Sequence, residues 1–288
     1  MGTMFDIVVY HSSRAEAERA IEKAMAEIVR LDRVMSNFKE ESDLSRLNRN
    51  GRGGFVDVDP SLYDVIRESI LFSRLSGGRF DVTISPVLRA WKEAHAEGRS
   101  PSDDELASAR QCVGYDNIET SAPHRIRYRR ECVEVDLGGI GKGYAVERAI
   151  ATLEAEGIRH ALVNAGGSSI AAIGAPPGRD GWPVALGADA PRHASLLLRN
   201  ESLSTSQQNL VSLAFARGSF GEIIDPRTGG PVQGSLAVSV VAPRATVSDA
   251  LSTALLMFSV DEARALLAQF PHASAVWMSG AGEYARVP

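Results

Sequence analysis

The sequence is short of cysteine. Its 288 residues contain only Cys112 and Cys132, and these have no CxxC spacing. Two cysteines are too few for the disulfide framework of a small secreted scaffold. Both stand among apolar residues, so we expect buried thiols, while a single bridge between them stays open.

Long apolar runs are also lacking. No stretch approaches the roughly 18 to 20 consecutive apolar residues of a membrane-spanning helix. The first residues, "MGTMFDIVVYHSSRAEAE", have no basic segment followed by a long apolar core and a cleavage site, so they do not resemble a signal peptide. As written, the chain is expected to be cytoplasmic. A periplasmic location is the alternative if a leader has been removed.

There is little net charge. The formal net charge is -5 at pH 7, which gives no broad basic field for a nucleic acid. The one basic cluster, "HRIRYRR" at 124 to 130, alternates arginines with Ile126 and Tyr128, a pattern typical of a strand with arginines on its solvent side. The 44% of hydrophobic residues can instead form a substantial core.

Periodic apolar residues and end signals predict the helices. Pro60 stands at a helix start, Ser102 and Glu105 have the spacing of a capping box, and Gly157 stands at a helix end. The predicted helices cover 14–34, 59–78, 101–112, 141–157, 249–258 and 261–269.

Short runs rich in branched apolar residues, separated by glycines and turns, predict the strands. They cover 3–10, 116–120, 124–129, 132–136, 160–167, 169–174, several runs between 182 and 241, and 273–278. Strands and helices are interleaved without a repeat or a low-complexity linker. The expected fold is therefore α+β, with antiparallel or mixed sheets and packed helices in a single domain over 1–288.

The segment 133–149, "VEVDLGGIGKGYAVERA", is rich in glycine around Lys142 and leads from a predicted strand into a helix. Glycines let the backbone approach a ligand, and the N-terminus of a helix favours a phosphate. The spacing fits neither a Walker A motif nor a dinucleotide fingerprint. A phosphate site and a plain strand-to-helix turn therefore both remain open.

The segment "TVSDALSTALLMF" at 246–258 places Asp249 and Thr253 four residues apart, on one face of a predicted helix. Ser248 or Asp249 is a good N-cap for that helix, which explains the aspartate without a ligand. A carboxylate beside a hydroxyl also suits a hard cation such as Mg2+. Both interpretations stay open on spacing alone.

Seven motifs, taken together and in order, carry a resemblance to a known family. They are "VMSNFKEESDLSRLN", "GGRFDVTISPVLRAW", "VDLGGIGKGYAVERA", "ALVNAGGSS", "LSTS", "IIDPRTGGPV" and "SDALSTALLMF". In this order they resemble the FAD:protein FMN transferase (ApbE) family over nearly the whole chain.

The resemblance implies a T-fold-like α+β domain that binds FAD as a substrate and uses Mg2+. It also implies an enzyme that transfers the FMN half of FAD, through a phosphoester bond, to a threonine or serine of an acceptor flavoprotein and releases AMP. The expected partners are FAD and that acceptor, with no nucleic acid and no membrane span.

The resemblance also implies site residues. Those expected to contact FAD are Met35, Arg79, Phe80, Asp81, Asp136, Gly138, Gly139, Lys142 and Thr205. Those expected to hold the metal are Asp249 and Thr253, with oxygens from Ser252, Gly139 and Gly141. Lys142 is expected to assist catalysis beside the diphosphate.

The chain departs from the family pattern at three positions. The family usually has a histidine just before "IIDP", where this chain has Glu222, which as a carboxylate can accept the proton of the acceptor hydroxyl. The usual glycine after "TS" is Gln207, and the acid that often follows "GG" is Ser168. The departures at Glu222 and Gln207 leave open an FAD-binding or flavin-delivery protein without catalysis. The resemblance leaves a further alternative, an Mg2+-dependent FAD pyrophosphatase, because some members of the family hydrolyse FAD to FMN and AMP.

Overall fold

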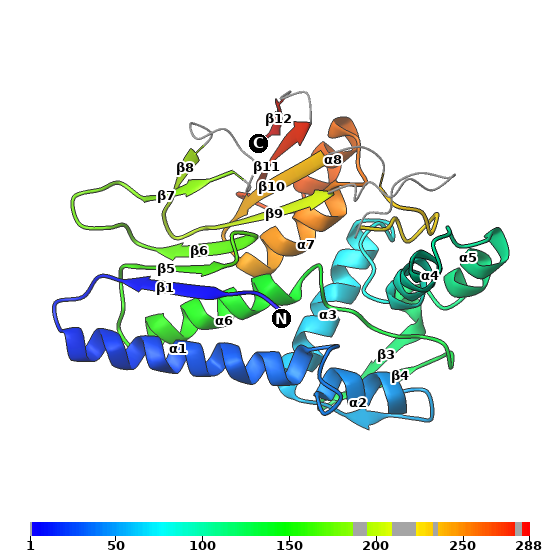
Figure 1. Cartoon of the computed structure of the whole chain (residues 1–288). Helices are drawn as coiled ribbons and strands as arrows, with labels where there is room; N and C mark the ends of the chain where they lie inside the picture. The colour runs from blue at the N-terminus through cyan, green and yellow to red at the C-terminus, as the bar shows by residue number, and fades with distance from the viewer. Residues whose placement is uncertain (1, 187–194, 209–222, 233–235, 280–283) are drawn as a thin grey trace. The chain divides into compact units, whose positions relative to one another are not determined.

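The chain opens with a strand and a long helix, as its sequence predicts. In the computed structural model, β1 (Phe5–Val9) leads into α1 (Arg14–Met35) (Figure 1). The structure describes residues 2–186, 195–208, 223–232, 236–279 and 284–288.

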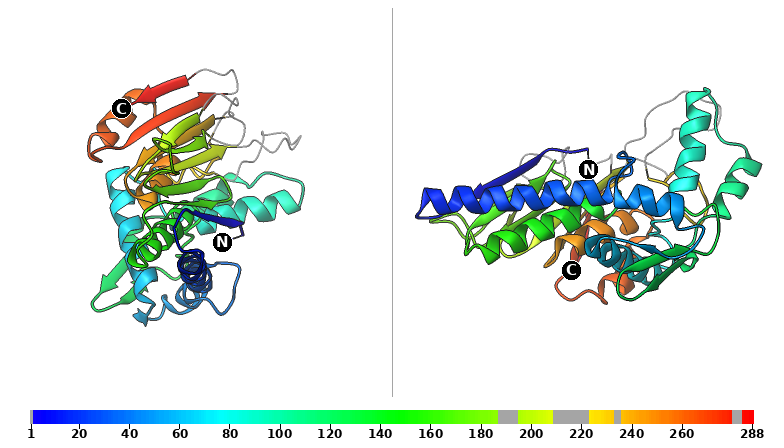
Figure 2. Two further views of the ribbon diagram at one scale, coloured as in Figure 1. Left: turned by 90° about the vertical axis from the view of Figure 1, so that its left-hand side faces the viewer. Right: turned by 90° about the horizontal axis from the view of Figure 1, so that it is seen from below.

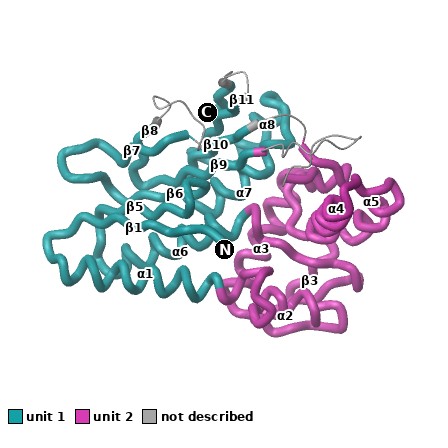
Figure 3. The backbone as a smooth tube through the Cα atoms, in the orientation of Figure 1, with its two compact units in different colours: residues 1–32, 140–207, 237–288 teal, residues 33–139, 208–236 magenta. Residues whose placement is uncertain are grey.

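The chain forms two compact units, each assembled from separate segments (Figure 3). Unit 1 comprises residues 1–32, 140–207 and 237–288, and unit 2 comprises 33–139 and 208–236. Single-domain organisation over 1–288 stays a prediction.

A seven-stranded sheet, antiparallel at β1-β5, β5-β6, β6-β9 and β11-β12, dominates the described part of unit 1. Its strand order is β1-β5-β6-β9-β10-β11-β12, and β1 pairs antiparallel with β5 from Phe5 opposite Ala165 to Val9 opposite Ala161. The remaining elements of this unit are α6 (Gly141–Ala155), β5 (Ala161–Ala165), β6 (Ser169–Ile173), β7 (Trp182–Ala185), β8 (Ser195–Leu198), β9 (Ser202–Gln208), β10 (Leu236–Ala242), α7 (Ala245–Leu255), α8 (Val260–Leu267), β11 (Ser274–Ser279) and β12 (Tyr284–Val287).

Both faces of β6 are covered, so all five of its residues are buried. Ala171 and Ile173 pack in a cluster with apolar residues of α1 and α6, two helices that lie side by side in Figure 2. Ile170 and Ala172 pack on the opposite face with residues of β7 and β8. A strand covered on both faces reads as a continuous apolar run, which "SIAAI" does.

Unit 2 combines helices with a small sheet of order β2-β4-β3. The capping box predicted at Ser102 and Glu105 is formed at the start of α5, and Asp59 caps α3 ahead of Pro60. The elements are α2 (Asp43–Asn50), β2 (Val56–Asp57), α3 (Pro60–Leu75), α4 (Ser85–Ala96), α5 (Asp103–Arg110), the 3-10 turn η1 (Tyr115–Asn117), β3 (Ile118–Ser121) and β4 (Arg125–Tyr128).

The predicted strand 132–136 is not formed. The side-chain amide of Asn48 binds both backbone groups of Val135, accepting from its N–H at 2.9 Å and donating to its carbonyl at 2.9 Å. The N–H of Asp136 donates to the carbonyl of Val82 at 2.7 Å. A side chain and a loop carbonyl thus supply the hydrogen bonds that a neighbouring strand would have made.

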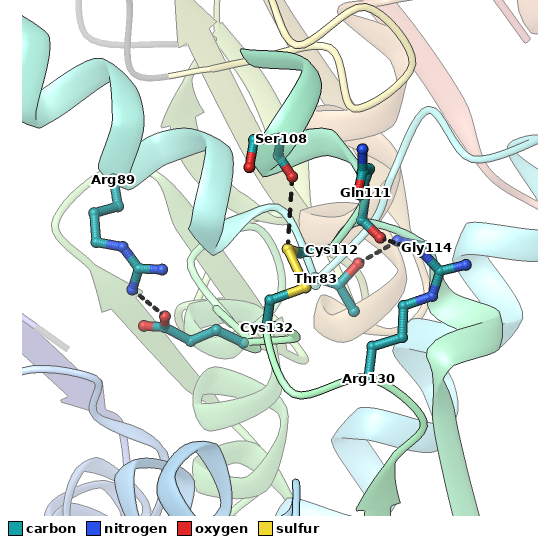
Figure 4. Close-up of a disulfide and its surroundings, with 9 residues drawn as sticks. Thr83, Arg89, Ser108, Gln111, Cys112, Gly114, Arg130 and Cys132 are labelled. Carbon is teal, nitrogen blue, oxygen red and sulfur yellow. Dashed lines mark hydrogen bonds and ion pairs between the residues drawn. A yellow bond between two sulfur atoms is a disulfide. The ribbon is translucent and has the colours of Figure 1, made fainter. Parts of the chain in front are cut away.

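The expectation of two buried thiols is wrong, because Cys112 and Cys132 form a disulfide with a Cα–Cα distance of 5.3 Å (Figure 4). The antiparallel pair β3 and β4 turns the chain back on itself between the two cysteines. Within the closed loop, the Gly114 N–H donates to Thr83 Oγ1 at 2.7 Å, and the Tyr115 N–H donates to Asp81 Oδ2 at 2.8 Å.

Residues 223–232 form a turn closed by the bridge between Ile224 and Pro231. The buried side chain of Gln208 accepts from the Ile223 N–H at 3.1 Å, and its Nε2 donates to the carbonyls of Ile223 at 3.3 Å and Val232 at 3.1 Å. One amide side chain therefore joins both ends of this turn.

None of the helices in the described parts of the chain combines the length and the apolar character that a membrane crossing requires.

Candidate active site

Asp249 lies inside a helix, not at its start. α7 begins at Ala245 with Arg244 in the N-cap position, and that end has no side-chain cap. The prediction that Ser248 or Asp249 caps the helix is therefore wrong. Asp249 is only 3% exposed. Because a buried carboxylate is costly, its position requires an explanation other than helix capping.

Its carboxylate is held by a residue of unit 1 that is remote in sequence. Oδ2 accepts from the backbone N–H of Gly143, in the first turn of α6, at 2.7 Å. Burial raises the pKa of the Asp249 carboxyl group, and the positive charge of Lys142 offsets only part of that rise. A cation bound next to this buried carboxylate would stabilise its charged form.

The two helices that carry this contact approach closely at Gly143. A Cβ at position 143 would lie 2.3 Å from the Ala245 carbonyl oxygen and 2.5 Å from the Asp249 Cβ. Real Cβ atoms do not approach so near, so only glycine fits between α6 and α7.

We therefore expect Gly143→Ala to lower the free energy of unfolding by about 1 to 3 kcal/mol, the usual cost of overpacking a core. Because the clash is with backbone atoms of α7, the helix must shift and carry Asp249 with it. Urea unfolding measures this effect. Gly53→Ala is the matched control, since a Cβ there meets no atom closer than 3.8 Å; equal stability of the two variants would contradict the prediction.

Hydroxyl groups lie along the same helix. Ser206 Oγ of β9 is 2.9 Å from Ser252 Oγ and 3.0 Å from Thr253 Oγ1. Ser252 Oγ donates to the Asp249 carbonyl at 2.9 Å. On the preceding residue of β9, Thr205 Oγ1 forms a hydrogen bond with Ser239 Oγ at 2.7 Å. The structure thus groups the Ser206 hydroxyl with those of Ser252 and Thr253, on the helix that also carries Asp249.

This donor set fits Mg2+. Its side-chain donors are all oxygen atoms, including one buried carboxylate, and Mg2+ is usually held by one or two carboxylates together with waters and substrate phosphates. Among the described residues, no group of three or more His, Cys, Asp and Glu side chains could hold a metal by itself. A cation held by these oxygens would need further ligands, such as water or a phosphate.

The predicted Gly-Lys turn leads into α6. Gly138 and Gly139 end the first segment of unit 2, and α6 of unit 1 begins at the buried Gly141, with Lys142 half-buried behind it. The sequence predicts a strand followed by a helix here. The helix is formed, whereas residues 132–136 are not a strand. The start of α6 presents N–H groups of the kind that bind anions.

The other predicted FAD contacts belong to unit 2. Met35 and Phe80 are 5% and 3% exposed, and the Phe80 ring meets Phe72 edge to face with centroids 6.2 Å apart. Arg79 is half-buried. These side chains are therefore part of, or next to, the packed interior of the unit.

Two acidic residues among these predictions already accept local hydrogen bonds. Asp81 accepts from the N–H and the hydroxyl of Thr83 at 2.8 and 2.6 Å, as well as from Tyr115, and burial raises its pKa. Asp136 accepts from the Gly138 N–H at 2.6 Å and from Asn37 Nδ2 at 2.8 Å. Both carboxylates fix the backbone around them.

Glu222 lies outside the described residues. Gln207 is part of β9, and the Ser168 N–H donates to the Ala165 carbonyl at 3.2 Å in the turn between β5 and β6.

Sequence reasoning missed the contacts of Ser206 with Ser252 and Thr253. A usable signal was present, since Ser202, Ser204 and Ser206 recur with the period of two that places residues on one face of a strand.

Comparison with known proteins decides the family, because the model of the ApbE family matches residues 1–277. The chain belongs to the ApbE family. Relatives of this ApbE chain named FAD:protein FMN transferase include the Treponema pallidum protein, 29% identical over 96% of this chain and 82% of the relative. The Haemophilus influenzae protein is 28% identical over 91% of this chain and 80% of the relative.

Solved ApbE structures have the same fold. The ApbE protein of Thermotoga maritima has a TM-score of 0.81 at 27% identity, covering 99% of this chain and 96% of that chain. The flavin transferase ApbE of Vibrio cholerae has a TM-score of 0.78 at 22% identity, covering 100% and 94%. The family resemblance and the α+β fold expected from the sequence are both confirmed.

Proposed function

We propose that this chain transfers the FMN half of FAD to a threonine or serine hydroxyl of an acceptor flavoprotein, in a reaction that depends on Mg2+ and releases AMP. The observation that carries the proposal is the match of the ApbE family to residues 1–277. The buried Asp249 carboxylate, which is bound by Gly143 and lies near Lys142, supports the proposal. A carboxylate can hold a metal ion and a lysine can neutralise phosphate charge, and the transfer of a group from a diphosphate requires both.

Asp249 and Thr253 would hold the Mg2+, with oxygens from Ser252, Gly139 and Gly141. Ser206, which contacts both Ser252 and Thr253, orients their hydroxyls. When bound, Mg2+ would neutralise charge on the diphosphate. The other residues proposed to contact FAD are Met35, Arg79, Phe80, Asp81, Asp136, Gly138, Gly139, Lys142 and Thr205.

In the transfer step, the acceptor hydroxyl oxygen attacks the phosphorus of the FMN half. The bond from that phosphorus to the bridging oxygen breaks, and AMP leaves with that oxygen. Lys142 stabilises the negative charge that develops on the leaving phosphate. The hydroxyl proton passes to a base, for which Glu222 is our candidate.

Incubation with FAD, Mg2+ and an acceptor domain tests this function. We expect equal amounts of AMP and FMN-labelled acceptor, read by chromatography and by the mass of the acceptor, and neither product with EDTA. An acceptor whose flavin-accepting hydroxyl residue is replaced by alanine is the control. FMN and AMP released without an acceptor would instead identify an FAD pyrophosphatase, and stably bound FAD without AMP would identify a flavin-delivery protein.

We also propose that the chain works in an oxidising compartment. The Cys112–Cys132 disulfide supports the periplasmic alternative over the cytoplasmic expectation, because disulfides persist outside the reducing cytosol.

A further inference from the structure

Two helices of unit 1, α6 and α7, begin without side-chain caps of their own. The N-cap positions are Ile140 for α6 and Arg244 for α7, and neither helix has a cap hydrogen bond from the side chain at that position. The first N–H groups of a helix have no partner within the helix, and a local polar side chain usually accepts from one of them. Both helices therefore need acceptors from elsewhere.

Each of the two helices receives an acceptor from the other. The Asp249 carboxylate of α7 accepts from the Gly143 N–H in the first turn of α6 at 2.7 Å. The Glu147 carboxylate of α6 accepts from the Thr246 N–H in the first turn of α7 at 3.0 Å. These four residues form a reciprocal cap, in which a carboxylate of each helix binds the N-terminal turn of the other.

The reciprocal cap fixes how α7 lies on α6. Gly143 and Glu147 are four residues apart on α6, and Thr246 and Asp249 are three apart on α7, so each pair shares one face of its helix. The helices also meet closely here, because a Cβ at position 143 would lie 2.3 Å from the Ala245 carbonyl oxygen. One hydrogen bond would allow α7 to pivot about it, whereas two bonds spaced along the helices prevent this.

Glu147 has a second partner, which contributes less. Its Oε1 accepts from Arg244 Nε at 2.9 Å, and the two side chains are 25% and 49% exposed. An ion pair with this much exposure stabilises a protein only slightly. Thr246, in contrast, is 0% exposed, and a buried N–H group without an acceptor is costly. The bond to the Thr246 N–H is therefore the main contact of Glu147.

We propose that Glu147 is a positioning residue that sets the start of α7 against α6 and so holds Asp249 in place for a divalent cation. The inference rests on the metal role given to Asp249 in the proposed function. Ser252 and Thr253, the hydroxyl residues proposed to share the metal, belong to the same helix. A shift of α7 would therefore displace all three side chains together, although Glu147 itself need not touch the cation, FAD or the acceptor.

Binding of Mn2+ to the full chain, measured by electron paramagnetic resonance with and without FAD, tests the inference. We expect Glu147→Ala to weaken Mn2+ binding by about 10-fold, the lower end of the loss that is usual when a group supporting a metal ligand is removed. Glu147→Gln should bind Mn2+ nearly as tightly as wild type, because its amide oxygen can still accept from the Thr246 N–H. In the transfer reaction of Glu147→Ala, the Mg2+ concentration for half-maximal rate should rise, while kcat at saturating Mg2+ should recover.

A second measurement follows the contact between the helices without any metal. The Gly143 amide donates to Asp249, so its hydrogen exchange with solvent reports how firmly α7 lies on α6. This exchange should be faster in Glu147→Ala than in wild type. It should stay close to the wild-type rate in Glu147→Gln.

Two control variants separate the reciprocal cap from other effects of the substitution. Glu156 stands at the other end of α6, is 21% exposed in its side chain and accepts from Lys23 Nζ at 2.7 Å. Glu156→Ala therefore removes a similar carboxylate and its ion pair from the same helix. Arg244→Ala removes the ion pair of Glu147 but leaves its bond to the Thr246 N–H. Both controls should be folded, as thermal unfolding measures, and should bind Mn2+ as wild type does.

The outcomes separate this inference from the function on which it rests. Wild-type Mn2+ affinity in folded Glu147→Ala would overturn the inference, even where Asp249→Ala abolishes binding. Equal losses in Glu147→Ala and Glu147→Gln would also overturn it, as would a loss of kcat that excess Mg2+ does not restore. If Glu147→Ala does not fold, Glu147→Asp replaces it, since its shorter side chain withdraws the carboxylate from Thr246, and wild-type affinity there has the same meaning. A wild-type chain that binds no Mn2+, even with FAD, would instead contradict the metal role of Asp249 itself.

Discussion

Asp249→Ala is expected to lower the Mg2+-dependent release of AMP from FAD by about 10²- to 10³-fold, the usual cost of removing one electrostatic group from a phosphoryl-transfer site. Asp249 carries a buried carboxylate on α7, about one turn ahead of the hydroxyls proposed to share the metal with it, Ser252 and Thr253. Its loss removes the charged oxygen that we propose binds Mg2+. Initial rates of AMP formation over a series of Mg2+ concentrations measure the effect.

Asp249→Asn separates the loss of charge from the loss of packing. Asparagine keeps the size of the side chain and an oxygen that can accept from the Gly143 N–H, but it carries no charge. In metal-free buffer we expect this variant to be at least as stable as wild type, because no charge is then buried. It should nevertheless be as inactive as Asp249→Ala. Full Mg2+-dependent activity of Asp249→Asn would contradict the metal role.

Removal of the disulfide is the second large effect. Cys112 and Cys132 are 20 residues apart in sequence, and closing a loop of that size stabilises a protein by about 3 kcal/mol, largely by restricting the unfolded chain. We expect dithiothreitol to lower the free energy of unfolding of the wild type by about this amount, measured in urea. The double variant Cys112→Ala, Cys132→Ala should start at the lower stability and should not respond to the reductant.

Removal of the disulfide should also destabilise the structure close to it. The disulfide closes the loop whose Gly114 and Tyr115 amides bind Thr83 and Asp81, so the Tyr115 amide is expected to exchange its hydrogen faster after reduction. The Gly143 amide in unit 1, held by Asp249, is the internal reference. Two reactive thiols in the untreated native chain would contradict the disulfide.

Features encoded within a few residues could be predicted from the sequence. The apolar spacing of 14–34 gives α1, observed as Arg14–Met35, and the Ser102 and Glu105 pair gives α5. α2 and α4 were missed. The short α2 has a cap at Ser42 that was overlooked, while α4 has no side-chain cap to signal its start.

The surroundings of Asp249 could not be predicted in this way. Capping rules place an aspartate at a helix start, yet its N–H partner, Gly143, is 106 positions away along the chain. The disulfide is a similar case, since its formation depends on how β3 and β4 fold back between the cysteines.

The register of β1 has a consequence for the order of events during synthesis. β1 pairs with β5, from Phe5 opposite Ala165 to Val9 opposite Ala161. At about 5 to 20 residues per second, the roughly 150 residues between them take on the order of 10 s to synthesise. During that interval the first strand has no partner, while residues 33–139 of unit 2 are made. The nascent chain thus carries an unpaired strand of the kind that chaperones protect, and unit 1 is completed last.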